Sequence, residues 1–171
     1  SSPSRGAKSF KNQSEFTMDN AYTWQPRSWI VPPELKDPLV RFEIRCDAII
    51  EKNKQGKYAT LLICGATGVG KSMFAEFFIH KYRKYRQNSK ILVINCSAIP
   101  ETLLESELFG YDKGAHSTAK DKKLGLFEIA EDGVIVLEEL GEISKELQAK
   151  LLIAIENRTF IRVGGTTQIP L

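Results

Sequence analysis

One eight-residue loop constrains this chain more than any other feature. It reads Gly65, Ala66, Thr67, Gly68, Val69, Gly70, Lys71, Ser72, and it fills every fixed position of the phosphate-binding pattern G-x-x-x-x-G-K-[ST]. The glycines permit a tight turn whose backbone N–H groups point at phosphate oxygens, and the following helix adds its positive N-terminal end. In this pattern Lys71 reaches the β- and γ-phosphates and Ser72 binds Mg²⁺. The sequence therefore predicts a nucleoside triphosphate site rather than an ordinary glycine-rich turn.

The size and composition indicate one globular domain. The chain has 171 residues, of which 42% are hydrophobic and 26% are charged, and this allows a substantial core. Its apolar stretches are far shorter than the roughly 20 residues of a membrane-spanning helix. The N-terminus has no apolar signal-peptide core. We therefore expect no membrane segment and a cytoplasmic protein.

Cysteines and basic residues give weaker signals. Cys46, Cys64 and Cys96 are odd in number and far apart, which favours buried thiols over a disulfide framework or a zinc site. The segment 81–86 mixes lysine and arginine with two tyrosines, and Lys90 follows. This cluster is either a surface for a phosphate backbone or the exposed end of a helix, where cations suit the negative dipole. The net charge of +3 is too small to decide between these alternatives.

The N-terminal part differs from the rest of the chain. Residues 1–34 are expected to be a flexible tail and linker, because they are polar at first and then rich in proline. Trp24 and Trp29 in this connector favour packing on the domain over binding a ligand. Residues 35–171 form the predicted domain, which starts with a helix near Leu39 that ends near Gly56.

Beyond that helix the sequence alternates between strand and helix patterns. Strands are predicted at 60–64, 91–94 and 134–137, and helices at 71–86, 101–109 and 144–157. Residues 160–169 predict a hairpin with Gly164 and Gly165 in a primed two-residue turn. Continuous apolar strands that alternate with helices indicate an α/β fold around a parallel sheet.

Two adjacent acids end the strand at 134–137. Glu138 and Glu139 would lie at the carboxyl end of the sheet, where α/β proteins bind ligands. A hydrolase for nucleoside triphosphates needs one acid near Mg²⁺ and another that orients the attacking water. A pair of acids that only caps a strand is the alternative, and the phosphate-binding loop upstream favours the catalytic interpretation.

The motifs together resemble the AAA+ ATPase domain of bacterial enhancer-binding proteins, the activators of sigma-54 RNA polymerase. The matching segments are 65–72, 93–96, 105–110, 124–128, 134–143 and 162–165, in unbroken order. The E-S-E-L-F-G block at 105–110 is far more discriminating than the phosphate-binding loop alone. The resemblance implies a three-layer α/β/α sandwich of the P-loop NTPase class that binds ATP and Mg²⁺.

The resemblance also implies roles for single residues. Glu138 would bind Mg²⁺ and Glu139 would activate water, while Asn95 matches the asparagine that holds the catalytic glutamate in an inactive orientation. Its alternative is a polar residue that satisfies hydrogen bonds at a strand end. Arg162 matches an arginine that acts across a subunit interface, with a surface ion pair as the alternative. Family members form homo-oligomeric rings, and DNA would be bound only by a domain outside this chain.

Three departures from the family pattern affect the functional interpretation. The sigma-54 contact loop, normally G-A-F-T-G-A, reads G-A-H-S-T-A at Gly114–Ala119, and Glu138 replaces an aspartate. The family continues beyond Leu171 with a strand that lies between the phosphate-loop strand and the acidic strand, and with a helical lid. We therefore expect a gap in the sheet and weak ATPase activity. Two functions remain open: an ATP-hydrolysing activator that remodels sigma-54 polymerase, and a non-hydrolysing, nucleotide-dependent regulatory module.

Overall fold

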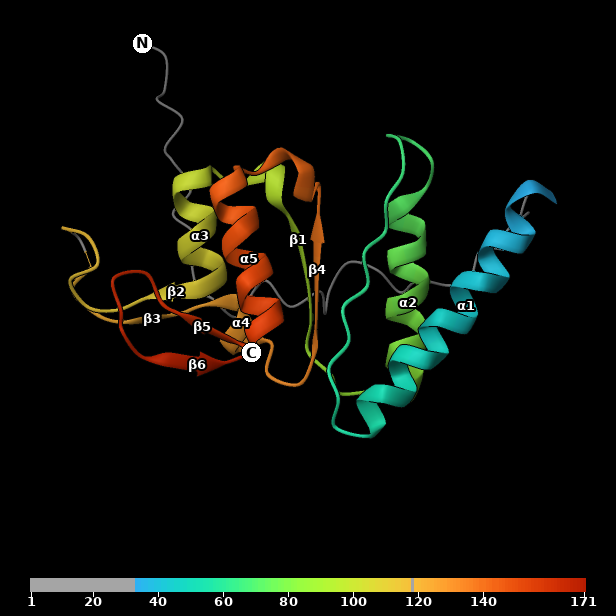
Figure 1. Ribbon diagram of the computed structural model, residues 1–171, viewed down its shortest axis with the longest axis horizontal. Helices are drawn as coiled ribbons and strands as arrows, with labels where there is room; N and C mark the ends of the chain where they lie inside the picture. Colours follow the sequence, from blue (N-terminus) through green and yellow to red (C-terminus); the bar gives the residue numbers. More distant parts are fainter. Residues whose placement is uncertain (1–32, 118) are drawn as a thin grey trace, which may run out of the picture.

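The computed structural model describes residues 33–117 and 119–171, which form three layers (Figure 1). Helices α1 and α2 make one outer layer, strands β1 and β4 lie in the middle, and α3 and α5 make the other outer layer. The predicted three-layer α/β fold is therefore confirmed. The predicted flexible tail, with Trp24 and Trp29, lies outside the described residues, apart from two residues at the start of α1.

The helices are α1 Pro33–Lys54, α2 Lys71–Tyr85, α3 Glu101–Phe109, α4 Leu126–Ile129 and α5 Lys145–Asn157, with 3-10 turns η1 Cys96–Ala98 and η2 Leu140–Glu142. The strands are β1 Ile91–Asn95, β2 Gly110–Tyr111, β3 Lys123–Leu124, β4 Val134–Glu138, β5 Thr159–Ile161 and β6 Gln168–Pro170.

The middle layer is a parallel strand pair. In its register Ile91 lies opposite Val134 and Asn95 lies opposite Glu138. Both faces of β4 are covered, because Ile135 packs against the core on the α3 and α5 side while Val134 packs against the core beside α2. Burial on both faces explains the continuous apolar run of β4, as expected for a parallel strand.

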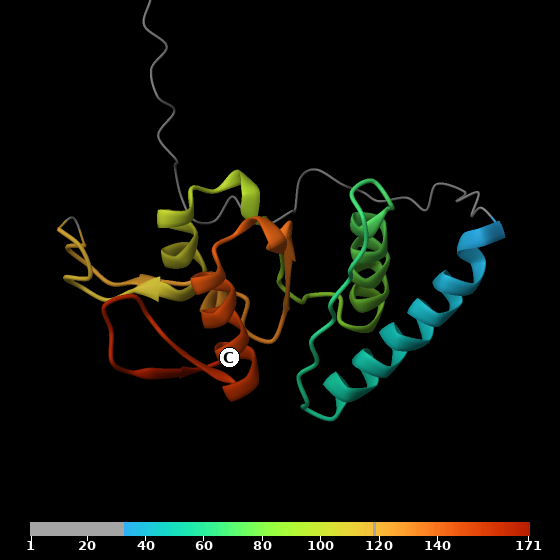
Figure 2. The ribbon, with the colours of Figure 1, turned by 45° about the horizontal axis from the view of Figure 1, so that its top comes forward.

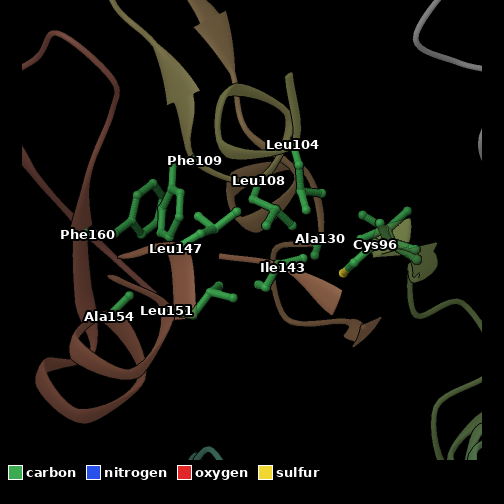
Figure 3. Packing of buried hydrophobic residues seen from close by; sticks show 12 residues of the cluster. Cys96, Leu104, Leu108, Phe109, Ala130, Ile143, Leu147, Leu151, Ala154 and Phe160 are labelled. Atoms are coloured by element: carbon green, nitrogen blue, oxygen red, sulfur yellow. The ribbon is translucent and has the colours of Figure 1, made fainter. Parts of the chain in front are cut away.

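Two apolar clusters hold the layers together. The larger one joins α3, α5 and β5, and Figure 3 shows Phe109 beside Phe160 and Leu147. The Phe109 and Phe160 ring centroids are 5.8 Å apart in a tilted arrangement. The smaller cluster, made of Cys46, Ile50, Phe78 and Tyr82, joins α1 to α2. Each outer layer therefore has its own core, and β4 contributes to both.

Most predicted helix boundaries are correct, and the capping residues explain them. Ser144 precedes α5 and its hydroxyl accepts a hydrogen bond from the Leu147 N–H at 3.3 Å. Gly110 ends α3 with φ +73°, in the left-handed region that favours glycine. The first helix was predicted too short: α1 begins at Pro33 and contains Pro38. Pro33 suits the first helical position, which needs no backbone donor.

The predicted strand at Thr60–Cys64 is wrong for this structure. The segment runs between β4 and α2 in both views, yet it has no regular strand structure, and β1 is the strand that pairs with β4 among the described residues (Figures 1 and 2). Leu62 in this segment is 71% exposed. Among the described residues, this apolar run therefore has no hydrogen-bonded strand beside it.

The hairpin at the C-terminal end also differs in detail. Strands β5 and β6 are antiparallel as predicted, but six residues, 162–167, join them instead of a two-residue turn. The Val163 N–H donates to the Gly110 carbonyl at 3.0 Å, and the Asp112 N–H donates to the Val163 carbonyl at 3.1 Å. The loop therefore bonds to the β2–β3 hairpin, and its tight turn lies one residue earlier than predicted, since the Gly165 N–H donates to the Arg162 carbonyl at 3.0 Å.

The basic cluster at the end of α2 is mostly paired. The Lys81 ammonium lies 2.9 Å from a Glu43 carboxylate oxygen and 2.8 Å from one of Asp47, both on α1. Arg86 pairs with Asp132 at 3.3 Å, and Lys90 pairs with Glu131 at 2.7 Å. These cations join α2 and β1 to neighbouring elements, so the structure favours the helix-end interpretation of the cluster. None of the described helices has the length and apolar character needed to cross a membrane.

Candidate functional site

The phosphate-binding loop lies at the N-terminal end of α2. Gly68 and Gly70 have φ of +82° and +90°, a conformation in which a side chain would be strained. Gly70 is the residue that precedes the first turn of α2. The loop at 65–70 thus bends sharply and ends on the helix terminus, as the motif predicts.

The first turn of α2 is suited to binding an anion. Gly70 provides no side-chain cap, and the first turn of this helix contains no acidic residue. The first backbone N–H groups of a helix have no partner inside the helix, and the helix dipole is positive there. An anionic group is the natural partner for such a terminus, so the backbone fits the phosphates of a nucleotide.

Lys71 folds its side chain back over the loop. Its ammonium donates to the carbonyl oxygens of Gly65 and Ala66, at 3.1 Å each. The side chains of Thr67, Val69 and Ser72 are exposed around it. The structure therefore brings the predicted cation, the loop amides and the Ser72 hydroxyl together at one end of α2. A phosphate could exchange for the two carbonyls as the partner of Lys71.

The acidic pair lies at the same end of the molecule as the loop. Strand β4 runs toward the end where α2 begins, and Glu138 is its last residue (Figure 2). Glu139 follows in the left-handed region with φ +53° and is exposed. The backbone bends at Glu139, between β4 and η2, so the two acids lie on either side of this bend. Both predicted acids thus lie at the end of β4 that points the same way as the start of α2, and their contact with a ligand held by the loop stays a prediction.

Asn95 ends the neighbouring strand, opposite Glu138 in the register. Its carboxamide oxygen accepts hydrogen bonds from the Ser97 N–H at 3.0 Å and from the Ser97 hydroxyl at 2.7 Å. Cys96 between them is 2% exposed and anchors this corner in the larger core cluster. The predicted site residue Asn95 is therefore fixed at the carboxyl end of β1. Sequence reasoning missed Ser97, although a serine two residues after an asparagine is a known signal for such local bonding.

Arg162 forms an ion-pair network within the chain. Its guanidinium donates from Nε to Glu128 at 2.9 Å, makes a second contact with Glu128 through Nη2, and lies 3.4 Å from Asp112 through Nη1. The Arg162 side chain is only 10% exposed. Hydrogen bonding to Glu128 raises the pKa of Arg162 above its ordinary value. The structure therefore places Arg162 between α4, the β2–β3 hairpin and the β5–β6 loop, and its predicted role across a subunit interface stays a prediction.

The predicted partner loop, Gly114–Ala119, projects between β2 and β3 (Figure 1). The Gly114 N–H donates to the Ala119 carbonyl at 2.9 Å, and Ala119 is buried. The His116 ring stacks edge-on against Tyr111 with centroids 4.8 Å apart. Thr118 lies outside the described residues. The histidine at the family's phenylalanine position thus packs on a neighbouring aromatic ring at the base of the loop.

Cysteines and possible metal ligands complete the description. Cys46 and Cys96 are buried as predicted, but Cys64 is exposed, so the prediction of three buried thiols is wrong at that position. Burial raises the pKa of the Cys46 thiol to about 11. Within the described part of the chain, no three histidine, cysteine or acidic side chains gather into a preformed metal cluster. Ser72 and Glu138 provide oxygen ligands of the kind that Mg²⁺ takes together with phosphates and water.

Comparison with known proteins assigns the family. Residues 44–171 match the family described as the Sigma-54 interaction domain. The chain is 47% identical over 113 residues to the DNA-binding transcriptional activator HyfR of Escherichia coli, which covers 66% of this chain and 17% of HyfR. It is 45% identical over 138 residues to the transcriptional regulatory protein FlbD of Caulobacter vibrioides, which covers 81% of this chain and 29% of FlbD. The chain thus spans less than a third of the length of these relatives.

A solved structure shows the same fold. The crystal structure of NtrX from Brucella abortus in complex with ATP has a TM-score of 0.57 and 24% identity, covering 78% of this chain and 26% of NtrX. The family match covers the phosphate-binding loop, both strands of the parallel pair and the acidic end of β4. This chain belongs to the Sigma-54 interaction domain family and has an α/β P-loop fold.

Proposed function

We propose that this chain is the nucleotide-binding part of a sigma-54-dependent transcriptional activator and that it binds ATP with Mg²⁺. The observation that carries the proposal is the open first turn of α2, which has the Lys71 ammonium folded over the preceding loop. Backbone donors, a cation and a helix terminus meet there, and this is the combination that nucleotide phosphates require.

The acidic end of β4 extends the proposal to ATP hydrolysis. Glu138 and Ser72 would hold Mg²⁺, which would neutralise charge that develops on the phosphates. Glu139 would orient the attacking water and accept its proton, because its carboxylate is exposed at the bend after β4. Asn95, at the end of the neighbouring strand, would hydrogen-bond to a carboxylate of this pair. The proposal is supported by the position of Ser72 in the first turn of α2, of Asn95 and Glu138 at the carboxyl ends of β1 and β4, and of Glu139 directly after β4.

The proposed partner is sigma-54 RNA polymerase, which Gly114–Ala119 would contact in a homo-oligomeric ring in the cytoplasm. Support comes from the family match and from the projection of this loop beyond the three layers. In such a ring Arg162 would hold α4 and the base of the Gly114–Ala119 loop together through Glu128 and Asp112. If these ion pairs open, it would reach across the subunit interface. The remodelling of the polymerase belongs to the whole activator, of which this chain is a part.

Nucleotide affinity and turnover test the proposal directly. ATP and ADP binding are measured by calorimetry with Mg²⁺, and phosphate release is measured on the same samples of the chain and of Lys71→Ala. We expect binding that Lys71→Ala abolishes and that Lys84→Ala, an exposed lysine at the far end of α2, leaves unchanged. Tight binding without turnover would favour the non-hydrolysing regulatory module. Absence of binding would overturn the proposal.

A further inference from the structure

The corner between β1 and η1 fixes the orientation of the Asn95 carboxamide. Two donors of Ser97, its backbone N–H and its hydroxyl, bond to one atom of Asn95 at 3.0 and 2.7 Å. A backbone N–H can only donate, so the atom that receives it is the carboxamide oxygen and not the nitrogen. The two ends of this amide, often hard to distinguish, are therefore assigned by chemistry at this position.

This arrangement leaves Asn95 with donors only. The carboxamide oxygen has two acceptor sites, and Ser97 takes both of them. The NH₂ group, with its two N–H donors, is the part of the side chain that remains for a ligand or a neighbour. Glu138 lies directly opposite in the register, and Glu139 follows it. An amide that offers only N–H groups to this end of the sheet is complementary to a carboxylate.

A buried residue anchors the backbone under the pair. Cys96 is 2% exposed and belongs to the larger core cluster, so residues 95–97 turn over a buried anchor while Asn95 and Ser97 remain exposed. Hydrogen bonds to the carboxamide oxygen also polarise the amide and strengthen its N–H groups as donors. Ser97 therefore has the position and the chemistry to control what Asn95 presents.

We propose that Ser97 is a positioning residue that holds the Asn95 NH₂ group toward the carboxylates at the end of β4. This rests on the proposed function, because it adds a residue to the same site. Ser97 touches no reacting atom in this scheme; it acts through Asn95. When the hydroxyl is lost, the backbone N–H of Ser97 still holds the carboxamide oxygen of Asn95. The amide group therefore becomes more mobile but does not flip to exchange its oxygen and nitrogen.

The first measurement needs no turnover. The side-chain NH₂ resonances of Asn95 are followed by ¹H–¹⁵N spectroscopy in the ¹⁵N-labelled chain, and Asn95→Asp assigns them. We expect Glu139→Gln or Glu138→Gln to shift these resonances in the wild-type background. Ser97→Ala should move them toward the values of a free side chain and reduce their response to the glutamate changes. Ser97→Thr, which keeps a hydroxyl, should retain both properties.

The second measurement is the rate of ATP hydrolysis. We expect Ser97→Ala to lower kcat by about threefold to tenfold, the size of one hydrogen bond, while KM and the ATP dissociation constant remain unchanged. Ser97→Thr should restore the rate. Ser106→Ala is the matched control, because the Ser106 hydroxyl also donates one hydrogen bond, to the Leu103 carbonyl, but on α3.

The two measurements distinguish the inference from the proposed function. If the NH₂ resonances of Asn95 ignore both glutamate substitutions and Ser97→Ala, the positioning role is overturned, whether or not the chain hydrolyses ATP. If they respond as expected while Lys71→Ala leaves nucleotide binding unchanged, the Ser97–Asn95 relationship stands and the proposed function fails. If Ser97→Ala lowers ATP affinity or stability more than Ser106→Ala does, and Ser97→Thr does not restore them, Ser97 is only structural.

Discussion

Arg162 and Glu128 are 34 residues apart in the sequence, yet the guanidinium holds both carboxylate oxygens of Glu128, with Nε at 2.9 Å from the first. Their side chains are only 10% and 14% exposed, so the pair is largely removed from water. Asp112 is a second partner of the same guanidinium. The pair joins α4 to the β5–β6 loop, and Asp112 connects both to the base of the Gly114–Ala119 loop.

Removal of Arg162 should destabilise the fold. Arg162→Ala leaves the largely buried Glu128 carboxylate without its cation, and we expect a loss of about 2 to 3 kcal/mol in the free energy of unfolding. Urea denaturation followed by circular dichroism measures it. Arg83→Ala, which removes an exposed arginine on α2, is the control and should change stability by less than about 0.5 kcal/mol. Equal effects of the two substitutions would contradict a structural role for Arg162.

The same pair predicts a loss of stability in acid. Burial raises the pKa of Glu128. The hydrogen bonds from Arg162 and from the Gly125 N–H lower it by more in sum, so the pKa lies below the ordinary value of 4.5. A carboxyl group with a lowered folded-state pKa stabilises the fold above its unfolded pKa and loses this contribution as the pH falls through the folded value. The free energy of unfolding should therefore decline below about pH 4.5.

Glu128→Gln tests the origin of that decline. Glutamine cannot ionise, so the variant should be less stable at neutral pH and should lose less stability between pH 5 and pH 3, roughly the range in which carboxyl groups of ordinary pKa titrate. Glu156→Gln, on an exposed position of α5, should keep the wild-type slope. A slope that is the same in Glu128→Gln and in the wild type would show that other carboxylates cause the acid loss.

The pattern of local signals explains how much of this structure the sequence predicts. Helix α3 follows from Pro100 and Gly110 at its ends, and β1 and β4 follow from short apolar runs, because these signals lie within the segments themselves. The run Thr60–Cys64 carries the same signal but is not a strand, since strand structure also needs a neighbour. The pairing of Arg162 with Glu128 and Asp112 depends on tertiary contacts that periodicity cannot show. In the site, the loop and the acids can be predicted from motifs, whereas the Asn95–Ser97 spacing is a common signal that takes on meaning only once the hydrogen bonds are seen.

Gly133 should tolerate no side chain, because β1 and β4 approach each other there. A Cβ at this position would lie 2.0 Å from the Lys90 carbonyl oxygen and 2.7 Å from that of Ala130, and both are backbone atoms. Gly133→Ala should therefore cost about 3 kcal/mol or more, or prevent folding. Gly141→Ala is the matched control, since a Cβ there has no neighbour within 4 Å. Soluble yield and thermal denaturation compare the two, and similar melting temperatures would contradict the close approach.

Cys64 should be the reactive thiol of the native chain. It is exposed directly before Gly65, whereas Cys46 and Cys96 are buried and burial raises the pKa of both. A thiolate is the reactive form, so a disulfide reagent should modify one cysteine rapidly and the other two only after unfolding. MgATP should slow the rapid reaction, because the nucleotide would cover the loop. Cys64→Ser should abolish the rapid phase, and a rapid phase that persists in this variant would contradict the burial of the other two thiols.

Glu138 is the position where one methylene group should determine the rate of hydrolysis. The extra carbon moves the carboxylate by about 1.5 Å relative to aspartate, while Mg²⁺ demands near-ideal octahedral geometry. We expect Glu138→Asp to raise kcat by at least about tenfold, because misplacement by this distance costs one to two orders of magnitude in rate. ATP affinity measured without Mg²⁺ should remain unchanged. Glu142→Asp in η2 removes the same methylene from an exposed acid and should leave kcat unaltered. A lower kcat in Glu138→Asp would mean that this site is built around the longer side chain and would contradict the prediction.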